Sequence, residues 1–519
     1  MKILKTFPFH PVIFSMYPVL ALLATNLVEV ELSVVVRPLL LSIAGTTLFL
    51  SLIYLGIKDL RRAGLMTSLL LILFFTYGHV YQVVELKEIF GLNIGRHRYL
   101  IPLYATLGTI GLWLFAKKIH ETRYATRAFN VISLLLLLFP VVQILSFRVR
   151  LSSGEKAAQQ LSNASMDYEL VTSEYLPDIY YLVLDTYTRE DALLRDFNFD
   201  NSNFLDGLRQ RGFYVADCSR SNYGYTQGSI TAALNLKYLP DLSEDLSKLG
   251  LGMGDVWVLL KQSTVRRKLE AIGYQTVAFD TGYEWSQLRD ADYYYGVGNT
   301  PFSLETVTPF EAMLLKSTGI LIFTEFQSKL FVDRLKSINF PHAEYVQAQL
   351  FILEQLTTIP TIEDPTFTFA HILIPHGPYV FDPEGNIRED SGYYGGDLAG
   401  PINERYLIDG YTGEIQFVNS RMLEIVDQLL EKSNPAPIIV IHGDHGLRDE
   451  NRFQILNAYY LPDDGSSMLY PQISPVNSFR VVFDTYFGTD LGLFPDMSFQ
   501  DDGHENPVPE YAPECHLNE

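Results

Sequence analysis

The chain has few cysteines and a shortage of basic side chains. Its 519 residues include only two cysteines, Cys218 and Cys515, which excludes a framework of several disulfides and a cysteine metal cluster. If this part of the chain is exported, the two cysteines form one bridge or stay as free thiols. Acidic residues outnumber Lys and Arg by 60 to 39, giving a net charge of −21. Because a nucleic-acid binder needs a basic surface to neutralise phosphates, we expect no nucleic-acid partner.

Long apolar stretches are abundant, and nearly all of them precede residue 150. They contain no Asp, Glu, Lys or Arg and cover residues 11–28, 38–57, 63–84, 99–116 and 128–147. Each is about as long as a helix that crosses a bilayer, and a signal peptide explains only the first. We therefore predict a transmembrane bundle of about five helices over residues 1–147. A transporter is disfavoured, because an ion path would need charged residues inside the spans.

Basic residues indicate how this bundle is oriented. They gather before the first stretch, after the second and after the fourth, at residues 2–5, 58–62 and 117–127. The positive-inside rule places these loops in the cytoplasm, and an odd number of spans then leaves the rest of the chain outside. We expect a multi-pass protein of the plasma (inner) membrane with an extracytoplasmic second part.

The rest of the chain divides into a polar connector, residues 148–176, and a domain of ordinary globular size, residues 177–519. In the domain, helical apolar stripes end at Gly or Pro and are followed by short apolar runs typical of buried strands. The clearest runs are residues 178–184, 213–215, 274–279, 367–374 and 438–441. This alternation predicts an α/β fold with a mainly parallel sheet covered by helices.

Two of these runs end in residues suited to a metal. The run from Ile438 leads into Gly443-Asp444-His445-Gly446, and the run from Asp178 ends at Asp185. Carboxyl ends of parallel strands share one edge of a sheet, where carboxylates and an imidazole together suit a divalent ion. Taken singly, the Asp-His pair also fits a surface turn, and Asp185 also fits a helix cap.

Two further segments carry polar groups at element boundaries. Thr226 stands where a helix begins, so that its hydroxyl is either a nucleophile beside a metal or a plain cap. His376, held between Pro375 and Pro378, is poorly suited to fill a helix or strand, which favours a role at the site. His371 lies inside a predicted strand and is interpreted as a packed or hydrogen-bonded core residue.

The order of these motifs resembles the alkaline phosphatase and sulfatase superfamily, in particular its membrane-anchored branch with lipoteichoic acid synthases and lipid A phosphoethanolamine transferases. The resemblance covers the whole chain. It implies an alkaline-phosphatase-like fold for the second domain. It also implies that Asp185, Thr226, Asp444 and His445 bind one divalent ion (Mn, Mg or Zn), with the ligands of a second metal unknown. Thr226 would be the nucleophile, and His376 would bind substrate.

The chain also departs from the family. Cys218-Ser219-Arg220-Ser221 does not match the Cys-x-Pro-x-Arg motif that sulfatases mature to formylglycine. Asp185 stands where the transferases usually have Glu. After Asp444-His445, no histidine matches the one that phosphoethanolamine transferases carry after their Asp-His pair.

The resemblance implies a phospho-group transferase with a membrane lipid or lipid-linked donor and an envelope glycan or alcohol acceptor. Two alternatives stay open: a phosphoester or sulfate-ester hydrolase using the same residues, and a non-catalytic membrane sensor or assembly protein that keeps the fold. No oligomeric state is predicted.

Overall fold

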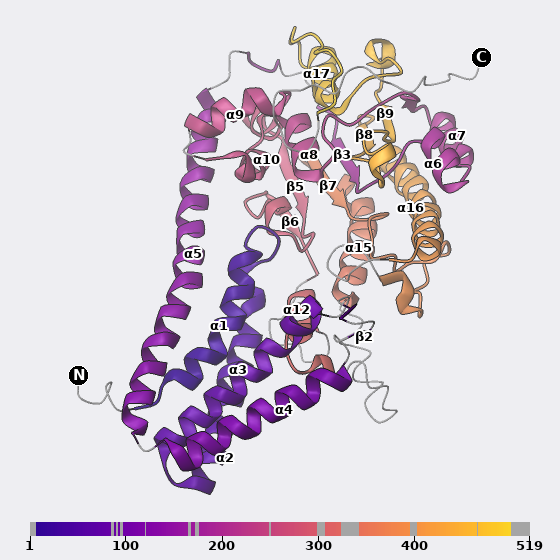
Figure 1. The fold of residues 1–519 in the computed structure, drawn as a ribbon. Coiled ribbons are helices and arrows are strands. Elements are labelled where there is room, and N and C mark those ends of the chain that lie inside the picture. Colours follow the sequence, from indigo (N-terminus) through magenta and orange to yellow (C-terminus); the bar gives the residue numbers. More distant parts are fainter. Residues whose placement is uncertain are drawn as a thin grey trace. The chain divides into compact units, whose positions relative to one another are not determined.

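The computed structural model describes residues 7–84, 88–89, 92–93, 97–119, 121–164, 168–171, 176–248, 251–297, 307–322, 342–394, 402–463 and 465–499. The chain divides into two compact units (Figure 1). The first comprises Met1–Val149 and Asn299–Glu344, and the second comprises Arg150–Gly298 and Tyr345–Glu519. Each unit is described by itself.

The first unit is a bundle of apolar helices. They are α1 (His10–Thr25), α2 (Val36–Ile57), α3 (Leu60–Val84), α4 (His97–Trp113) and the part of α5 (Thr122–Ala164) that precedes Arg150, with a short β1–β2 pair (Glu88–Ile89 and Leu92–Asn93) before α4. Among the described residues, four helices are long and apolar enough to cross a membrane. The fifth, α1, has 16 residues, or about 24 Å, less than the roughly 30 Å of a hydrocarbon core. The predicted bundle is confirmed, with one helix shorter than a full span.

Helix α5 continues well beyond its apolar part. The predicted connector begins at residue 148, yet the helix runs to Ala164. Ser152, Ser153 and Gly154 do not end it, because neither polarity nor a single glycine prevents helical hydrogen bonding. In the second unit, Arg150 at the base of this extension pairs with Asp255 at 3.1 Å.

A segment far along the chain also belongs to the first unit. Helix α12 (Pro309–Lys316) begins with a capping box between Thr308 and Glu311. Arg37 Nε donates to Glu311 Oε1 at 2.6 Å, and the Gly319 amide donates to the carbonyl oxygen of Phe74 in α3 at 2.7 Å. This segment lies inside the range 177–519 that we assigned to the second domain, and its tertiary contacts place it in the bundle instead.

A seven-stranded sheet forms the centre of the second unit, in the order β4-β9-β8-β3-β7-β5-β6. The strands are β3 (Ile179–Leu184), β4 (Tyr214–Val215), β5 (Gln275–Phe279), β6 (Tyr293–Tyr295), β7 (Thr366–Ile372), β8 (Ile438–Gly443) and β9 (Asn457–Tyr460). The five adjacent strands β8, β3, β7, β5 and β6 run parallel to one another, while β9 is antiparallel to both β8 and β4. The mainly parallel sheet predicted from the apolar runs is confirmed.

Helices cover both faces of this sheet. The helices of the second unit are α6 (Glu190–Phe197), α7 (Ser202–Gln210), α8 (Thr226–Asn235), α9 (Leu239–Lys248), α10 (Trp257–Lys261), α11 (Thr264–Ala271), α15 (Ala343–Gln355), α16 (Glu404–Lys432) and α17 (Pro475–Tyr486). Tyr181 of β3 packs edge-on against Phe479 of α17, whereas the adjacent Tyr180 lies near Ser433, directly after α16. Successive strand residues face opposite sides, so α17 and α16 lie on opposite faces.

Candidate metal centre

The three central strands bring side chains to one edge of the sheet. Leu184 of β3 is in register with Ile372 of β7 and with Gly443 of β8. Asp185 and Asp444 are therefore the first residues beyond two adjacent parallel strands. This is the convergence that the sequence predicted for the two aspartates. Neither is a helix cap, because Arg189 and Arg448 are the N-caps of the helices that follow them.

The Asp444-His445 turn is fixed by its glycines and by backbone hydrogen bonds. Asp444 Oδ1 accepts from the amides of Thr186 and His445, each at 2.8 Å. A Cβ at Gly443 would collide with the carbonyl oxygen of Tyr187, and one at Gly446 with that of Asn451. Only glycine fits on either side of the pair. Asp444 and His445 are both buried, so the turn is not a surface loop.

Asp185, His371 and Asp444 form a buried cluster in which each offers one ligand atom within 4.8 Å of the others. His371 Nε2 lies 3.3 Å from Asp185 Oδ2. Asp185 Oδ1, Asp444 Oδ2 and His371 Nδ1 have no hydrogen-bond partner among the described residues. Two buried carboxylates with unpartnered oxygens are strongly unfavourable unless a cation joins them. This donor set of oxygens and one imidazole fits a divalent metal ion.

Thr226 and His445 lie together beside this cluster. Thr226 Oγ1 is 3.3 Å from His445 Nε2, which in turn is 3.6 Å from Asp444 Oδ2. His445 Nδ1 donates to the carbonyl oxygen of Gly446 at 2.9 Å, so Nε2 carries the lone pair of the neutral ring. Thr226 is the first residue of α8, and Tyr225 is the N-cap. Its hydroxyl is thus not a helix cap, and it stands at the positive end of the helix dipole.

His376 lies in the loop after β7, between cis peptide bonds at Pro375 and Pro378. Its Nδ1 donates to the carbonyl oxygen of Gly377 at 2.7 Å. Burial raises the pKa of Asp185, but the charge of His376 and then the contacts with His371 and His445 lower it more, to about 2. Asp185 is therefore ionised at neutral pH, as a metal ligand must be.

The sequence interpretation missed His371 as a site residue. It is buried, as expected of a core residue, and its ring packs against Trp285 with 5.4 Å between centroids. His371 nevertheless lies next to Asp185 and Asp444, with its ring nitrogen close to their carboxylate oxygens. Its position one residue before the end of β7 was the available signal, since that is the strand edge where the aspartates converge.

Cys218 is disulfide-bonded. Cys515, for which the sequence left a bridge to Cys218 or a free thiol open, lies outside the described residues.

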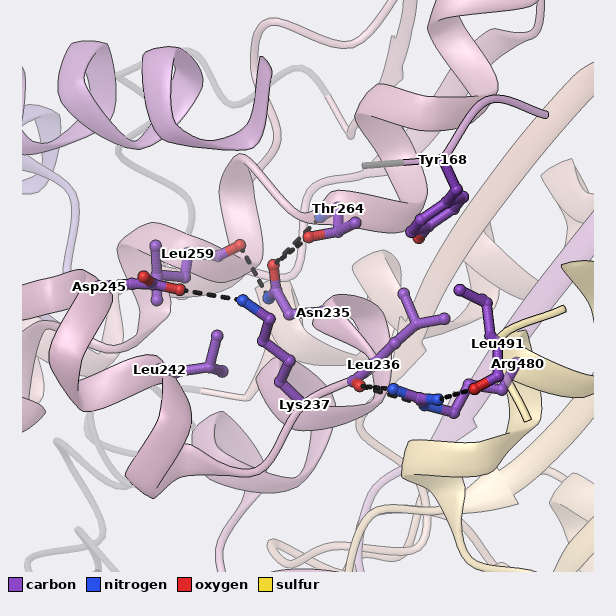
Figure 2. A pocket seen from close by; sticks show the side chains of 10 residues that line it. All are labelled: Tyr168, Asn235, Leu236, Lys237, Leu242, Asp245, Leu259, Thr264, Arg480 and Leu491. Atoms are coloured by element: carbon purple, nitrogen blue, oxygen red, sulfur yellow. Dashed lines mark hydrogen bonds and ion pairs between the residues drawn. The ribbon is translucent and has the colours of Figure 1, made fainter. Parts of the chain in front are cut away.

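A separate small cavity of about 90 Å³ lies at the other end of α8 (Figure 2). Its lining residues are Tyr168, Asn235, Leu236, Lys237, Leu242, Asp245, Leu259, Thr264, Arg480 and Leu491. Lys237 pairs with Asp245 at 3.2 Å, and the Arg480 guanidinium donates to backbone carbonyl oxygens, including that of Leu236. Thr226 begins the same helix that Asn235 ends, so the cavity is not part of the metal cluster.

No family model matches this chain, and no curated protein does. The chain is similar to several solved structures, including the following three, each with low sequence identity to this chain. The C-terminal periplasmic domain of EcEptC from Escherichia coli, in complex with Zn, is 14% identical, with a TM-score of 0.38 over 62% of this chain and 86% of that one.

The integral membrane protein lipooligosaccharide phosphoethanolamine transferase A from Neisseria meningitidis is 9% identical, with a TM-score of 0.35 over 91% and 95% of the two chains. The putative sulfatase yidJ from Bacteroides fragilis is 13% identical, with a TM-score of 0.34 over 61% and 75%. Phosphoethanolamine transferases and sulfatases are the classes that the motifs of this chain resemble.

Proposed function

We propose that the chain is a membrane-anchored, metal-dependent phospho-group transferase in which Thr226 is the nucleophile. The observation that carries the proposal is the buried cluster of Asp185, His371 and Asp444, whose unpartnered ligand atoms lie next to the Thr226–His445 pair. The motif resemblance supports the same assignment. In this proposal Asp185, Asp444, His445 and Thr226 hold the ion, and His371 is an additional ligand.

The chemistry follows from the positions of these side chains. A divalent ion at the cluster would lower the pKa of the Thr226 hydroxyl and offset the charge of the phosphoryl oxygens. Thr226 Oγ1, after its hydroxyl has lost a proton to water, would form a bond to phosphorus while the bond to the donor's ester oxygen breaks, and His376 would give a proton to that leaving oxygen. An acceptor hydroxyl would next attack phosphorus and give its proton to His376, while the bond from phosphorus to Thr226 Oγ1 breaks and the Thr226 oxygen takes a proton back from water. Each step breaks one ester bond to phosphorus and forms another.

We further propose that the donor is a membrane lipid or lipid-linked compound, that the acceptor is an envelope glycan or alcohol, and that the catalytic domain lies outside the plasma membrane. An anchored domain works on a substrate confined to the same surface, which suits a lipid donor. The basic loops between the spans support the orientation. Mn, Mg and Zn are all compatible with the cluster.

Intact-mass analysis of the purified full chain tests the nucleophile. After incubation with envelope lipids, we expect a phospho-adduct that peptide mapping assigns to Thr226. Thr226→Ala should lose the adduct, and Thr226→Ser, which keeps a hydroxyl, should retain it. An adduct on Thr226→Ala would refute the assignment.

A hydrolase is the second candidate, because water can replace the acceptor alcohol at the same residues. A chromogenic phosphodiester assayed with and without a glycan or alcohol acceptor separates the two activities. A transferase forms the phosphorylated acceptor, whereas a hydrolase releases the same amount of product without it. If Thr226→Ala has no effect on turnover or on the phenotype of a strain that depends on the gene, a non-catalytic role is favoured.

A further inference from the structure

Glu414, in the middle of α16, is a fully buried carboxyl group outside the metal cluster. Its Oε1 accepts from the amide of Phe381 at 3.1 Å, and the amide of Val380 also contributes. Its Oε2 has no hydrogen-bond partner among the described residues. A buried carboxyl group with one oxygen lacking a hydrogen bond lowers the stability of the fold. We therefore expect Glu414 to have a role that offsets this cost.

The backbone that Glu414 holds is the loop that carries His376. This loop packs closely along α16. A Cβ at Gly410 would collide with the ring of Tyr379, and one at Gly413 with the guanidinium of Arg388. The ring of Phe381 stacks at a tilt on that of Phe417, with centroids 4.8 Å apart. Glu414 is a fully buried polar contact within this interface, and it binds the loop five residues beyond His376.

Electrostatics connect the same groups. The charged groups that act on Glu414 are Arg388 and His376, and Tyr345 of α15 is influenced by both Glu414 and Asp185. The Tyr345 hydroxyl lies 3.4 Å from the carbonyl oxygen of His376. Glu414, the loop and Asp185 are thus neighbours in one buried region. Arg388 donates to the carbonyl oxygen of Phe381 and to Asp409, so its hydrogen bonds fix the far side of the loop.

We propose that Glu414 is a positioning residue for His376: by accepting from the loop backbone, it fixes the histidine close to Asp185 and to the phosphoryl group. The inference rests on the substrate-side role proposed above for His376. Glu414 itself does not contact the reacting atoms. Removing its acceptor leaves the buried Phe381 amide unsatisfied, which allows the loop and His376 to shift.

The test is a double-mutant cycle in the full chain, with a chromogenic phosphodiester as substrate. Glu414→Leu is made with His376 intact and in a His376→Ala background. We expect kcat/KM to fall about tenfold to hundredfold with His376 present, because small displacements of a catalytic group have effects of this size. In the His376→Ala background the loss should be below about twofold. Glu414→Gln, which keeps an acceptor for Phe381, should restore most of the activity.

Glu424→Leu, on an exposed part of the same helix, is the matched control. Thermal unfolding checks that each variant is folded. If Glu414→Leu does not fold, Glu414→Asp replaces it: its shorter side chain withdraws the acceptor from Phe381 and should give the same dependence on His376. Equal losses in both backgrounds would show a merely structural role and overturn the proposal.

A second readout does not depend on activity. Diethyl pyrocarbonate acylates histidine, and peptide mapping gives the rate at His376 in each variant. We expect this rate to change at least about threefold in Glu414→Leu and little in Glu414→Gln or Glu424→Leu. An unchanged rate in Glu414→Leu refutes the positioning role even if turnover falls. If the wild type has no turnover, the function proposed for Thr226 fails, and the acylation rates still decide the role of Glu414.

Discussion

Replacing Asp444 by Asn should have opposite consequences with and without a metal ion. Asp444 Oδ1 accepts from two amides, whereas Oδ2 has no partner among the described residues. Asn keeps the first oxygen and replaces the second by a neutral amide. In metal-free protein the change removes a buried negative charge near Asp185, so the melting temperature should stay equal or rise. In metal-loaded protein it removes a ligand.

The size of the metal effect can be estimated. An ion present at about 100 times its Kd stabilises the wild type by roughly 2.7 kcal/mol, which raises Tm by about 5 °C in a domain of this size. Loss of an anionic ligand weakens binding by about 100-fold or more. At the same ion concentration, Asp444→Asn would then gain only about 0.4 kcal/mol, or less than about 1 °C.

The assay is thermal unfolding of the full chain in detergent, after chelation and after addition of Mn²⁺, Mg²⁺ or Zn²⁺. Asp178→Asn is the matched control, because Asp178 lies at the opposite end of β3 and accepts from Thr366 instead of facing the cluster. It should keep the full metal-induced rise. A wild-type rise that Asp444→Asn retains, or no rise with any of the three ions, would refute the metal site.

Three further outcomes follow from buried contacts. Tyr181→Phe removes the 2.6 Å hydrogen bond to His442 Nε2 and should lower the free energy of unfolding in urea by about 1–3 kcal/mol, with the metal-induced Tm rise unchanged. Gly446→Ala places a methyl group against a backbone carbonyl and should abolish that rise, whereas Gly254→Ala, with open space around it, should not. Burial raises the pKa of Glu414 from 4.5 to about 8. Between these pH values only the folded state retains the proton, so stability should fall as pH rises, by up to about 4 kcal/mol, and Glu414→Gln should lack this slope in urea titrations at pH 5 and 8.

The central strands could be predicted because buried parallel strands are continuously apolar. The predicted runs at 178–184, 274–279 and 438–441 correspond to β3, β5 and β8. The approximate ends of β3 and β8 could therefore be predicted, and so could the convergence of Asp185 and Asp444 at one edge of the sheet. Strand β9 and its antiparallel direction could not be predicted, since Asn457–Tyr460 is short and partly polar and its direction depends on pairing with β8.

The association of residues 307–322 with the helical bundle could not be predicted from local sequence patterns either. The segment follows β6 in sequence and looks like part of the α/β domain. What assigns it to the bundle is a set of contacts across more than 200 positions, such as the ion pair between Arg37 and Glu311, both largely buried. No sequence pattern within the segment indicates that Glu311 pairs with the distant Arg37.

Two histidines show most clearly why the site could be predicted only in part. His371 and His442 occupy equivalent positions, because each is in register with Val183 on opposite sides of β3. Both are buried in apolar strands, so their local sequences suggest the same core role. His442 fulfils it: Nδ1 donates to the carbonyl oxygen of Gly443, and Nε2 accepts from Tyr181. His371 has Asp185 within 3.3 Å instead. The difference between a core histidine and a candidate ligand thus depends on which side chain the neighbouring strand presents, and only the folded sheet determines that.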